Sequence, residues 1–405
     1  MAAHEVAIVG GGAIGCSTAW HLATTTDLDV CLIEKEEAVA THQSGRNSGV
    51  LHPGFNYQPG SVKAEFSTAG TRRAKAYCRD RGVPLEEFGV VVVATTPAEE
   101  ARLAALQEQA TANGVDTELV DGDRLDELEP HAAGAAALHC PAAASIDARQ
   151  YVYALARDAR DAGVSVYLGT EVTDVSHTGG EVALATSKGD LTAEYLVNAA
   201  GLGADRIAHR LGVGEAYRIV PFRGEYRELV PDRRELCRSM IYPTPDPDLP
   251  FLGVHFTRRV DDRVIVGPNA VLAGGREAYG RWDIDLRDLL GTVGYPGFWR
   301  LFADRRMLRL AVAELHKTYR HDRFVAAARS LVPDLQRADL VDSYAGIRAQ
   351  VVRRDGVLVG DPIVEHGPVS THVLNAVSPG LTASLPFGEH LADAVSDRFA
   401  HAQTT

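Results

Sequence analysis

The chain opens with a short apolar run followed by a turn and a helical pattern. Residues 5–9 are typical of a buried parallel strand, and residues 10–15 form a glycine-rich turn. A helix is predicted over 13–23, and a second strand over 29–33 ends at Glu34. The order of strand, helix and strand predicts a βαβ unit at the N-terminus.

The remaining hydrophobic pattern mixes helices with short strands. It predicts helices over 61–81, 98–113 and 147–162, the last with Asp147 as its N-cap. It predicts strands over 90–94, 164–168, 171–175, 181–186 and 191–198. Residues 217–270 combine β-branched and aromatic residues with turn signals, which predicts an antiparallel sheet, and residues 283–335 are mostly helical.

The end of the chain returns to the style of its beginning, with a strand at 371–374, a Pro-Gly turn and a helix over 381–399. This predicts an α/β (α+β overall) fold, in which a Rossmann-like domain built from separated segments carries an inserted antiparallel-sheet substrate domain. The nucleotide domain is expected to comprise residues 1–82, 145–220 and 338–405. The substrate or cap domain is expected to comprise residues 83–144 and 221–337.

Composition narrows the class of protein. The 405 residues carry a net charge of -13, which disfavours nucleic acid as a partner. The five cysteines are scattered without C-x-x-C spacing, so we expect reduced buried thiols and no metal site. No apolar run reaches the roughly 18 residues of a membrane span, and no signal peptide is visible, so a cytoplasmic location is expected.

The glycine turn has the spacing of a dinucleotide-binding fingerprint, G-x-G-x-x-G. Gly10 would permit the tight turn, Gly12 would let a pyrophosphate approach the backbone, and Gly15 would let helix and strand pack closely. Ala13 and Ile14 begin the helix whose N-terminus would face the phosphates. Glu34, followed by Lys35, ends the second strand and can accept hydrogen bonds from ribose hydroxyls. The fingerprint alone does not separate NAD from FAD.

A polar, glycine-rich loop over 40–54 favours FAD. Such a loop can thread beside a flavin ring and offer backbone and hydroxyl contacts, and NAD dehydrogenases rarely carry one there. Its candidate contacts are Ser44, Arg46, Asn47 and Ser48, and it ends near His52. An ordinary surface loop would explain the glycines but not Arg46 and His52 together.

This loop and other motifs resemble the D-amino-acid-oxidase-like FAD family, which includes glycine and sarcosine oxidases and glycerol-3-phosphate dehydrogenase. The chain looks most like the L-2-hydroxyglutarate oxidase/dehydrogenase branch. The resemblance runs nearly end to end. It is carried by residues 42–52, 57–64, 221–226, 242–247, 252–257, 267–270, 344–350 and 375–382.

The resemblance implies FAD as the cofactor and an antiparallel sheet whose face covers the flavin. It implies that Val172 lies beside the adenine and that Ala200 and Gly201 lie near the cofactor. It also implies that the motif around Gly346 enters the active site at the end of a strand. Finally, Gly380, Leu381 and Thr382 would aim a helix N-terminus at the flavin O2 edge, where negative charge develops on reduction.

Oxidation of a 2-hydroxy acid needs a base for the hydroxyl proton and cations for the carboxylates. His52 and His255 are the candidate bases, although most of the 15 histidines must be structural or solvent-facing. Arg348 is the candidate carboxylate clamp, because a guanidinium forms two parallel hydrogen bonds to a carboxylate. Arg223 could serve a second carboxylate or the flavin, and Tyr242 is a candidate hydroxyl donor.

The expected reaction is oxidation of L-2-hydroxyglutarate to 2-oxoglutarate by hydride transfer to flavin N5. The alternative is a related flavoenzyme acting on glycine, sarcosine or glycerol 3-phosphate. A non-catalytic or tRNA-modifying flavoprotein would carry a basic surface rich in Cys and Lys, which this composition lacks. Oxygen, a quinone and a protein acceptor all fit as electron acceptor. The family suggests a peripheral membrane contact, yet the sequence shows no polybasic or strongly amphipathic anchor.

Overall fold

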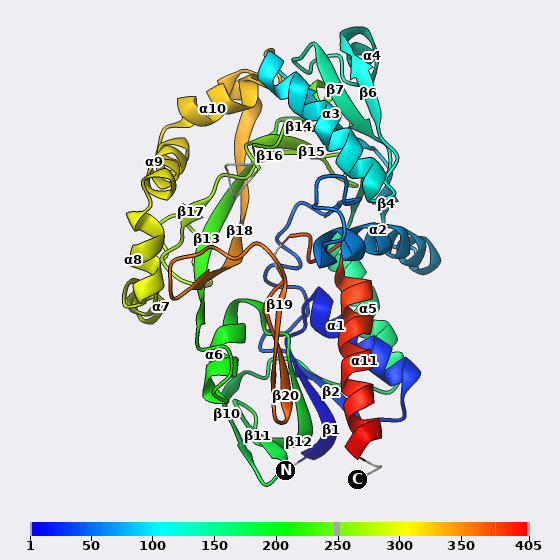
Figure 1. Ribbon diagram of the computed structural model, residues 1–405, viewed down its shortest axis with the longest axis vertical. Helices are drawn as coiled ribbons and strands as arrows, with labels where there is room; N and C mark the ends of the chain where they lie inside the picture. The colour runs from blue at the N-terminus through cyan, green and yellow to red at the C-terminus, as the bar shows by residue number, and fades with distance from the viewer. Residues whose placement is uncertain (1, 247–251, 377, 403–405) are drawn as a thin grey trace.

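Two β-sheets organise the computed structural model, which describes residues 2–246, 252–376 and 378–402 (Figure 1). The first sheet has eight strands. They are β1 (Ala2–Val9), β2 (Val30–Ile33), β9 (Ser165–Tyr167), β10 (Val172–Thr178), β11 (Glu181–Thr186), β12 (Leu191–Asn198), β19 (Ile363–Gly367) and β20 (Ser370–Asn375).

The centre of the first sheet is parallel, in the order β9, β2, β1, β12, β20. Val9 stands level with Ile33 on one side and Asn198 on the other, so the carboxyl ends of these strands meet at one edge. Helices α1 (Ala13–Thr25), α5 (Ala148–Asp161) and α11 (Ser384–Ala402) pack together on one face (Figure 1). In folds of this kind, ligands bind at the carboxyl edge of the parallel strands.

The second sheet has nine strands and is antiparallel except where β14 pairs with β5. Its strands are β5 (Val90–Ala94), β6 (Glu118–Asp121), β7 (Ala136–Cys140), β13 (Tyr217–Leu229), β14 (Met240–Pro243), β15 (His255–Arg258), β16 (Val264–Gly267), β17 (Val271–Leu272) and β18 (Leu340–Arg353). The long strands β13 and β18 pair from Tyr217 and Arg353 to Leu229 and Leu340. In Figure 1 they run roughly along the long axis of the molecule.

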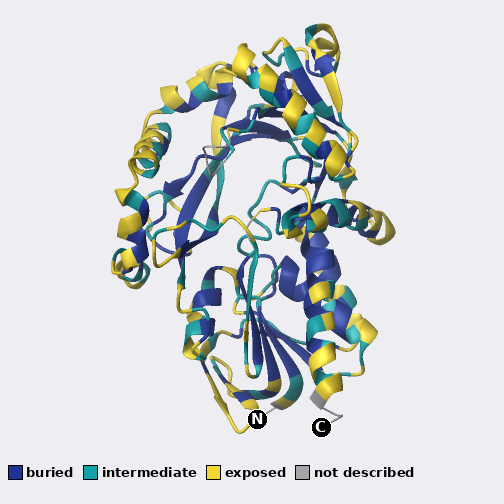
Figure 2. Ribbon diagram, viewed as in Figure 1, coloured by how far each residue is buried: buried dark blue, intermediate teal, exposed yellow. Residues whose placement is uncertain are grey.

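Helices and a small sheet complete the fold. The helices are α2 (Val62–Arg81), α3 (Pro97–Ala112), α4 (Gly122–Leu128), α6 (Ala204–Arg210), α7 (Leu286–Val293), α8 (Pro296–Ala303), α9 (Arg305–Tyr319) and α10 (His321–Arg329). The short strands β3 (Val50–Leu51), β8 (Ala144–Ile146) and β4 (Leu85–Glu86) form the small sheet. The central strands of both large sheets are mostly buried, whereas the edge strands β6 and β10 and the helices α7, α8 and α9 show exposed stretches (Figure 2).

Local sequence signals explain most helix ends. Asp147 caps α5 as predicted, since its carboxylate accepts from the backbone N–H groups of Arg149 and Gln150. Thr96 and Glu99 form a capping box at the start of α3. The predicted βαβ unit, the antiparallel sheet and the helical region over 283–335 are confirmed. Helix α11 begins at Ser384, three residues later than predicted, because residues 381–383 form a turn.

The sequence pattern missed several short elements, among them β6, β7, β19 and α4. The division into two domains stays a prediction. Strand β18 (340–353), which the predicted division assigns to the nucleotide domain, pairs along β13 in the second sheet. All five cysteines are buried and free. None of the helices in the described part of the chain has the length and apolar character needed to cross a membrane.

Candidate active site

A cavity of about 1840 Å³ is lined by residues from both large sheets and from the loops at the carboxyl edge of the parallel strands. All predicted cofactor-binding residues except Gly15 line it. They are Gly10, Gly12, Ala13, Ile14, Glu34, Lys35, Ser44, Arg46, Asn47, Ser48, Val172, Ala200, Gly201, Gly346, Gly380, Leu381 and Thr382. Four of the five predicted catalytic residues also line it, namely His52, Tyr242, His255 and Arg348.

The glycine turn is shaped by close backbone contacts. Gly10 has φ +115°, and a Cβ atom there would lie 2.4 Å from the carbonyl oxygen of Ala199. A Cβ on Gly15 would lie only 1.9 Å from the carbonyl oxygen of Gly10, so helix α1 could not pack this closely against the turn with any larger residue. Gly15 therefore acts behind the cavity wall, which explains its absence from the lining.

Two side chains brace the turn from outside it. The Glu34 carboxylate is buried and accepts from the backbone N–H of Gly11 at 2.7 Å and from that of Glu36 at 2.9 Å. The hydroxyl oxygen of Ser44 accepts from the backbone N–H of Ala13, the first residue of α1, at 2.9 Å. The N-terminus of α1 thus faces the cavity with its glycine turn held in place, which is the arrangement that binds phosphate groups.

The loop over 40–54 is held in a defined shape. The Asn47 side-chain amide donates to the carbonyl oxygens of Gln43 and Ser44, and its oxygen accepts from the N–H of Gly49. Through these three hydrogen bonds, the Asn47 side chain fixes the shape of the loop. The Arg46 guanidinium packs on an aromatic ring, 4.0 Å from the centre of the Tyr279 ring.

The loop also contacts two distant segments. A Cβ on Gly346 would lie 2.4 Å from the carbonyl oxygen of Arg46, so strand β18 meets the loop backbone directly. The buried Thr382 hydroxyl accepts from the N–H of His52 at 3.0 Å and donates to the carbonyl oxygen of Val50. The turn over 380–382 therefore joins the loop just before α11.

His52, Tyr242 and His255 form an aromatic group on the cavity wall. The ring centres of Tyr242 and His255 are 4.5 Å apart, and those of His52 and Tyr242 are 6.4 Å apart. Burial lowers the pKa of both histidines to about 4, and for His255 the charge of Arg348 contributes in the same direction. Both imidazoles are therefore neutral near pH 7. The Tyr242 hydroxyl is buried, with Thr257 as its polar neighbour.

The tautomer of His255 follows from the hydrogen bond that its ring makes with the Gly253 carbonyl. Its Nδ1 lies 2.8 Å from the carbonyl oxygen of Gly253. Because a carbonyl can only accept, Nδ1 carries the proton in the neutral ring, and Nε2 keeps a free lone pair. This is the protonation state that a general base requires.

Arg348 reaches the same cavity from β18. It is enclosed deeply enough that burial lowers the pKa of its guanidinium below the ordinary value, although an arginine stays charged near neutral pH. The charge of Arg348 in turn lowers the raised pKa of the neighbouring Tyr226 hydroxyl. Arg348 is thus a cation in an enclosed site with aromatic neighbours.

Arg223 does not join this group. It pairs with Ile347 across the two long strands, whereas Phe222 pairs with Arg348, so strand alternation turns Arg223 to the opposite face of the sheet. There its guanidinium donates to the carbonyl oxygen of Gly280 at 2.8 Å and to Glu225 at 3.1 Å. The prediction that Arg223 binds a carboxylate or the flavin finds no support in this placement.

Sequence reasoning missed many of the cavity residues, among them Tyr226, Gln350 and Lys63. Tyr226 and Gln350 lie within motifs already quoted, and both follow known lining residues by two positions, which is the spacing of one strand face. Lys63 donates to the carbonyl oxygen of Gly360 at 2.7 Å, and burial lowers the pKa of its ammonium. The strand period could have identified Gln350 from Arg348, and Lys63 also lies within a motif quoted above, residues 57–64.

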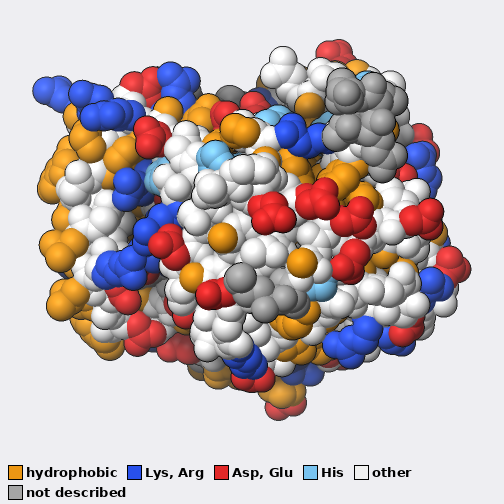
Figure 3. All heavy atoms as spheres, turned by 90° about the horizontal axis from the view of Figure 1, so that it is seen from below, with side chains coloured by type: hydrophobic (Ala, Val, Ile, Leu, Met, Phe, Trp, Pro, Cys, Tyr) orange, Lys and Arg blue, Asp and Glu red, His pale blue; other side chains and the backbone are white. Residues whose placement is uncertain are grey.

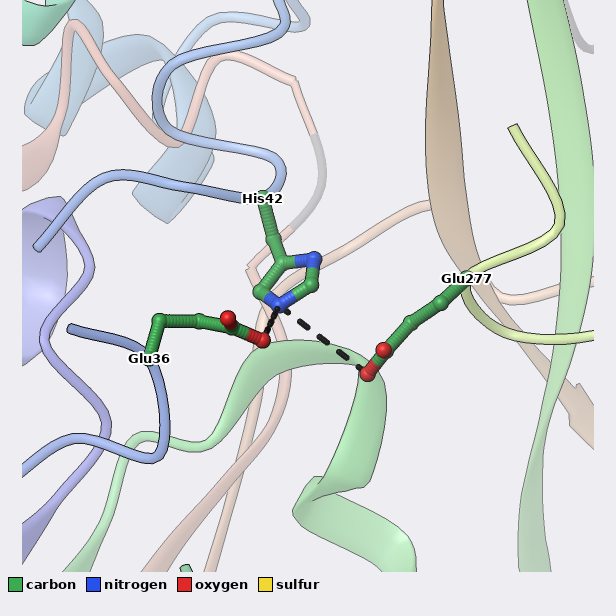
Figure 4. A group of neighbouring side chains, drawn as sticks. All are labelled: Glu36, His42 and Glu277. Carbon is green, nitrogen blue, oxygen red and sulfur yellow. Dashed lines mark hydrogen bonds and ion pairs between the residues drawn. The ribbon is translucent and has the colours of Figure 1, made fainter. Parts of the chain in front are cut away.

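One group of three residues in the described part of the chain has metal-ligand geometry, although no metal site was predicted. His42 Nε2 lies 2.9 Å from Glu36 and 3.9 Å from Glu277 (Figure 4). The Lys35 ammonium contacts Glu277 and lies 3.6 Å from Glu36, so both carboxylates already have a positive charge beside them. We read the group as an ion-pair network at the cavity edge.

Comparison with known proteins agrees with this geometry. A family model described as "FAD dependent oxidoreductase" matches residues 5–394. The chain belongs to the FAD dependent oxidoreductase family.

Several curated relatives match this chain over almost its whole length. L-2-hydroxyglutarate dehydrogenase of Escherichia coli K12 is 38% identical over 399 residues, which cover 98% of this chain and 94% of that protein. The mitochondrial L-2-hydroxyglutarate dehydrogenase of Homo sapiens is 35% identical over 414 residues, covering 98% and 89%.

Solved structures of similar fold include two oxidases. The FAD-bound L-alpha-glycerophosphate oxidase of Mycoplasma pneumoniae matches with a TM-score of 0.77 at 24% identity, covering 98% of this chain and 95% of that chain. Glycine oxidase of Geobacillus kaustophilus matches with a TM-score of 0.70 at 23% identity, with the same coverage. These likenesses establish the fold, a parallel nucleotide-binding sheet beside an antiparallel substrate sheet.

As a member of the FAD dependent oxidoreductase family, this chain uses FAD, and the cavity fits that cofactor. Its volume exceeds the range of about 300–1,000 Å³ that holds a drug-sized ligand, which leaves room for a dinucleotide and a small substrate. A Cβ on Gly12 would meet only the Ser44 hydroxyl within 4 Å, so the backbone there is open to a phosphate group. The acidic Glu34 stands where ribose hydroxyls are expected.

Proposed function

We propose that this chain oxidises L-2-hydroxyglutarate to 2-oxoglutarate. The single observation that carries the proposal is the convergence of His255, His52, Tyr242 and Arg348 on the cavity that also contains the nucleotide fingerprint. The relatives named L-2-hydroxyglutarate dehydrogenase support the substrate, because they match this chain over nearly its full length.

His255 is the base that we assign to the hydroxyl proton. Its neutral ring presents the Nε2 lone pair, while the Gly253 carbonyl fixes the ring through Nδ1. When bound, FAD supplies a two-electron acceptor for the hydride that leaves the substrate carbon. Loss of the hydride from carbon and of the proton from oxygen leaves the carbonyl group of 2-oxoglutarate.

Arg348 is the group that we assign to a substrate carboxylate. A guanidinium in an enclosed site binds a carboxylate through two parallel, charge-assisted hydrogen bonds. The charge of Arg348 also lowers the pKa of His255, which keeps that ring neutral near pH 7 but weakens it as a base. A substrate carboxylate bound to Arg348 would offset this charge beside His255.

His52 and Tyr242 complete the proposed site. His52 adds a second neutral imidazole, and the Tyr242 ring lies near both histidine rings in a tilted arrangement. We assign them to shaping the substrate pocket and excluding water from it. For the electron acceptor, oxygen, a quinone and a protein all remain open, and a cytoplasmic location remains a prediction.

Anaerobic reduction of the FAD-loaded protein tests the substrate. L-2-Hydroxyglutarate is expected to bleach the visible absorbance band of the oxidised flavin, and D-2-hydroxyglutarate is the matched control that should leave it unchanged. Glycine, sarcosine and glycerol 3-phosphate are tested in parallel. Bleaching by one of these three without bleaching by L-2-hydroxyglutarate would replace the proposed substrate with the alternative.

A further inference from the structure

One segment beside the second sheet, residues 276–288, bonds to loops of the first sheet on both sides of the glycine turn. The segment follows β17 and runs into the first residues of α7. Its partners lie in the loop after β2 and in residues 202–206, which follow β12. We call residues 276–288 the clasp.

Two side chains of the clasp hold the loop after β2. The Glu277 carboxylate contacts the Lys35 ammonium, and Figure 4 shows Glu277 beside His42 of that loop. The Tyr279 hydroxyl lies 2.6 Å from His42 Nδ1. The Tyr279 ring stacks on the His42 ring and also receives the Arg46 guanidinium. This end of the clasp is thus held by one ion pair, one hydrogen bond and ring contacts.

The direction of the hydrogen bond between Tyr279 and His42 follows from Glu36. His42 Nε2 lies 2.9 Å from the Glu36 carboxylate, which only accepts, so Nε2 carries the proton of the neutral ring. Burial lowers the pKa of His42, which keeps the ring neutral near pH 7. Burial raises the pKa of Tyr279 to about 12, so its hydroxyl keeps its proton and donates it to Nδ1. Tyr279→Phe would therefore remove one donated hydrogen bond and keep the ring.

The other end of the clasp is anchored beside α6. The Arg276 guanidinium pairs with the Asp205 carboxylate and donates to the carbonyl oxygen of Leu202. Asp288 pairs with Arg206 and accepts from the backbone N–H of Arg276 at 2.6 Å. The start of the clasp and the start of α7 are therefore tied to each other and to the residues after β12.

The two ends of the clasp differ in burial. The side chains of Arg276 and Asp205 are 8% and 1% exposed, whereas those of Lys35 and Glu277 are 35% and 46% exposed. Breaking a buried ion pair leaves a charge without a partner or water, whereas water readily replaces a partner in a half-exposed pair. The end at the loop after β2 is therefore the end at which the clasp opens.

The strand order places a bound nucleotide beneath the clasp. Strand β1 lies between β2 and β12 and ends at the glycine turn. A segment bonded to the loops after both neighbours of β1 spans the carboxyl end of β1, where the phosphates of a dinucleotide bind. Arg276, Glu277 and Ala278 line the same cavity as Gly10 and Gly12. FAD in this cavity would therefore lie between the glycine turn and the clasp.

Position, and not charge alone, distinguishes the clasp contacts. Charged side chains of both signs are spread over the outside of the molecule, as Figure 3 shows for one face. An exposed ion pair by itself therefore marks no function. The contacts of the clasp differ because they join loops on two sides of the cofactor cavity.

We propose that the clasp retains FAD in its cavity, and that the contacts of Glu277 and Tyr279 with the loop after β2 set the rate at which FAD leaves. FAD dissociates when this end of the clasp opens, while the anchor at Asp205 keeps the segment attached to the first sheet. The Lys35–Glu277 and His42–Tyr279 contacts exist only in the closed form. Removing them therefore shifts the equilibrium toward the open form.

The rate of FAD release from the loaded full chain tests the proposal. The protein is loaded with radiolabelled FAD, an excess of unlabelled FAD is added, and the label that stays on the protein is followed over time. Glu277→Gln/Tyr279→Phe should release the label about tenfold faster than the wild type, because a half-exposed ion pair and a hydrogen bond are both lost. Tyr279→Phe alone should release it about threefold faster. Added salt should speed release from the wild type more than from Glu277→Gln, because it screens the Lys35–Glu277 pair.

A matched control joins α2 to α11. Arg73 and Glu389 form an ion pair with side chains 34% and 46% exposed, and neither residue lines the cavity. Glu389→Gln should therefore release FAD at the wild-type rate. Release at the wild-type rate from the double variant, or equal acceleration by Glu389→Gln, would overturn the proposal. If the double variant does not fold, Tyr279→Phe decides, and a wild-type rate there contradicts the role of the clasp. Release is measured without substrate, so the result is independent of the proposed oxidation of L-2-hydroxyglutarate.

Discussion

Replacement of His255 by glutamine is expected to remove the proposed base while preserving the cavity. Glutamine keeps a polar side chain of similar length but cannot take up a proton from the substrate hydroxyl. A positioned general base contributes about 10²–10⁴-fold to rate, so kcat/KM should fall by that factor while FAD stays bound. His52→Gln is the matched control, since His52 lies in the same cavity and burial lowers its pKa equally.

The pH dependence gives this prediction a magnitude from the structure. The neutral ring is the active form, so activity is lost as the pH falls through the pKa of His255 in the free enzyme. With a pKa of about 4, roughly nine-tenths of the rings are neutral at about pH 5, whereas an ordinary histidine of pKa 6.5 would be only about 3% neutral. The two cases differ by about 30-fold in kcat/KM at that pH.

The assay is the pH profile of kcat/KM for L-2-hydroxyglutarate, measured for the wild type and both glutamine variants. The expected profile is flat from neutral pH down to about pH 5, with an acid limb near the lowered pKa. An acid limb close to pH 6.5 would show that the base is not held in the buried state described here. A large loss in His52→Gln with little loss in His255→Gln would move the role of base to His52.

Three further substitutions probe the clamp, the glycine turn and a buried ion pair. Arg348→Ala should raise KM by about 10–100-fold while flavin content stays constant, because it removes a charge-assisted carboxylate contact; loss of flavin instead would make Arg348 a cofactor ligand. Gly15→Ala should yield protein with little bound FAD, measured as the ratio of flavin to protein absorbance, since its Cβ would lie 1.9 Å from the Gly10 carbonyl oxygen; full flavin content would contradict the packing described. Arg276→Ala should lower the free energy of unfolding by about 3–5 kcal/mol in urea titration, because it leaves the buried Asp205 carboxylate without its guanidinium partner. A change below about 1 kcal/mol would show that water reaches that pair.

Local spacing explains why the nucleotide end of the site could be predicted. The strand, the glycine turn, the helix and Glu34 follow one another within a few turns of chain, and each position has a steric or electrostatic reason. The structure places all of them as expected, with Glu34 bonded to the Gly11 N–H. Helix caps such as Asp147 are local for the same reason.

The placement of some site residues depends on long-range strand pairing, which the sequence does not show. Arg223 and Arg348 lie on opposite faces of the sheet because of the register of β13 against β18, and these strands lie far apart in sequence. The orientation of α9 is a second case, because a helical pattern shows that a helix is amphipathic but not which side faces the core. The bonds of Glu314 and Thr318 to the loop after β16 (residues 268–270) show that these two polar residues face the core, while other apolar residues of α9 are exposed.

A crystal structure of the FAD-loaded protein with bound 2-oxoglutarate would test the central claim most directly. We expect the flavin ring in the cavity beside the histidine and arginine wall, with the Arg348 guanidinium on a carboxylate of the ligand. His255 Nε2 should lie within about 3 Å of the keto oxygen, the distance of a hydrogen bond. A ligand whose carboxylates avoid Arg348, or a flavin ring remote from His255, would contradict the account.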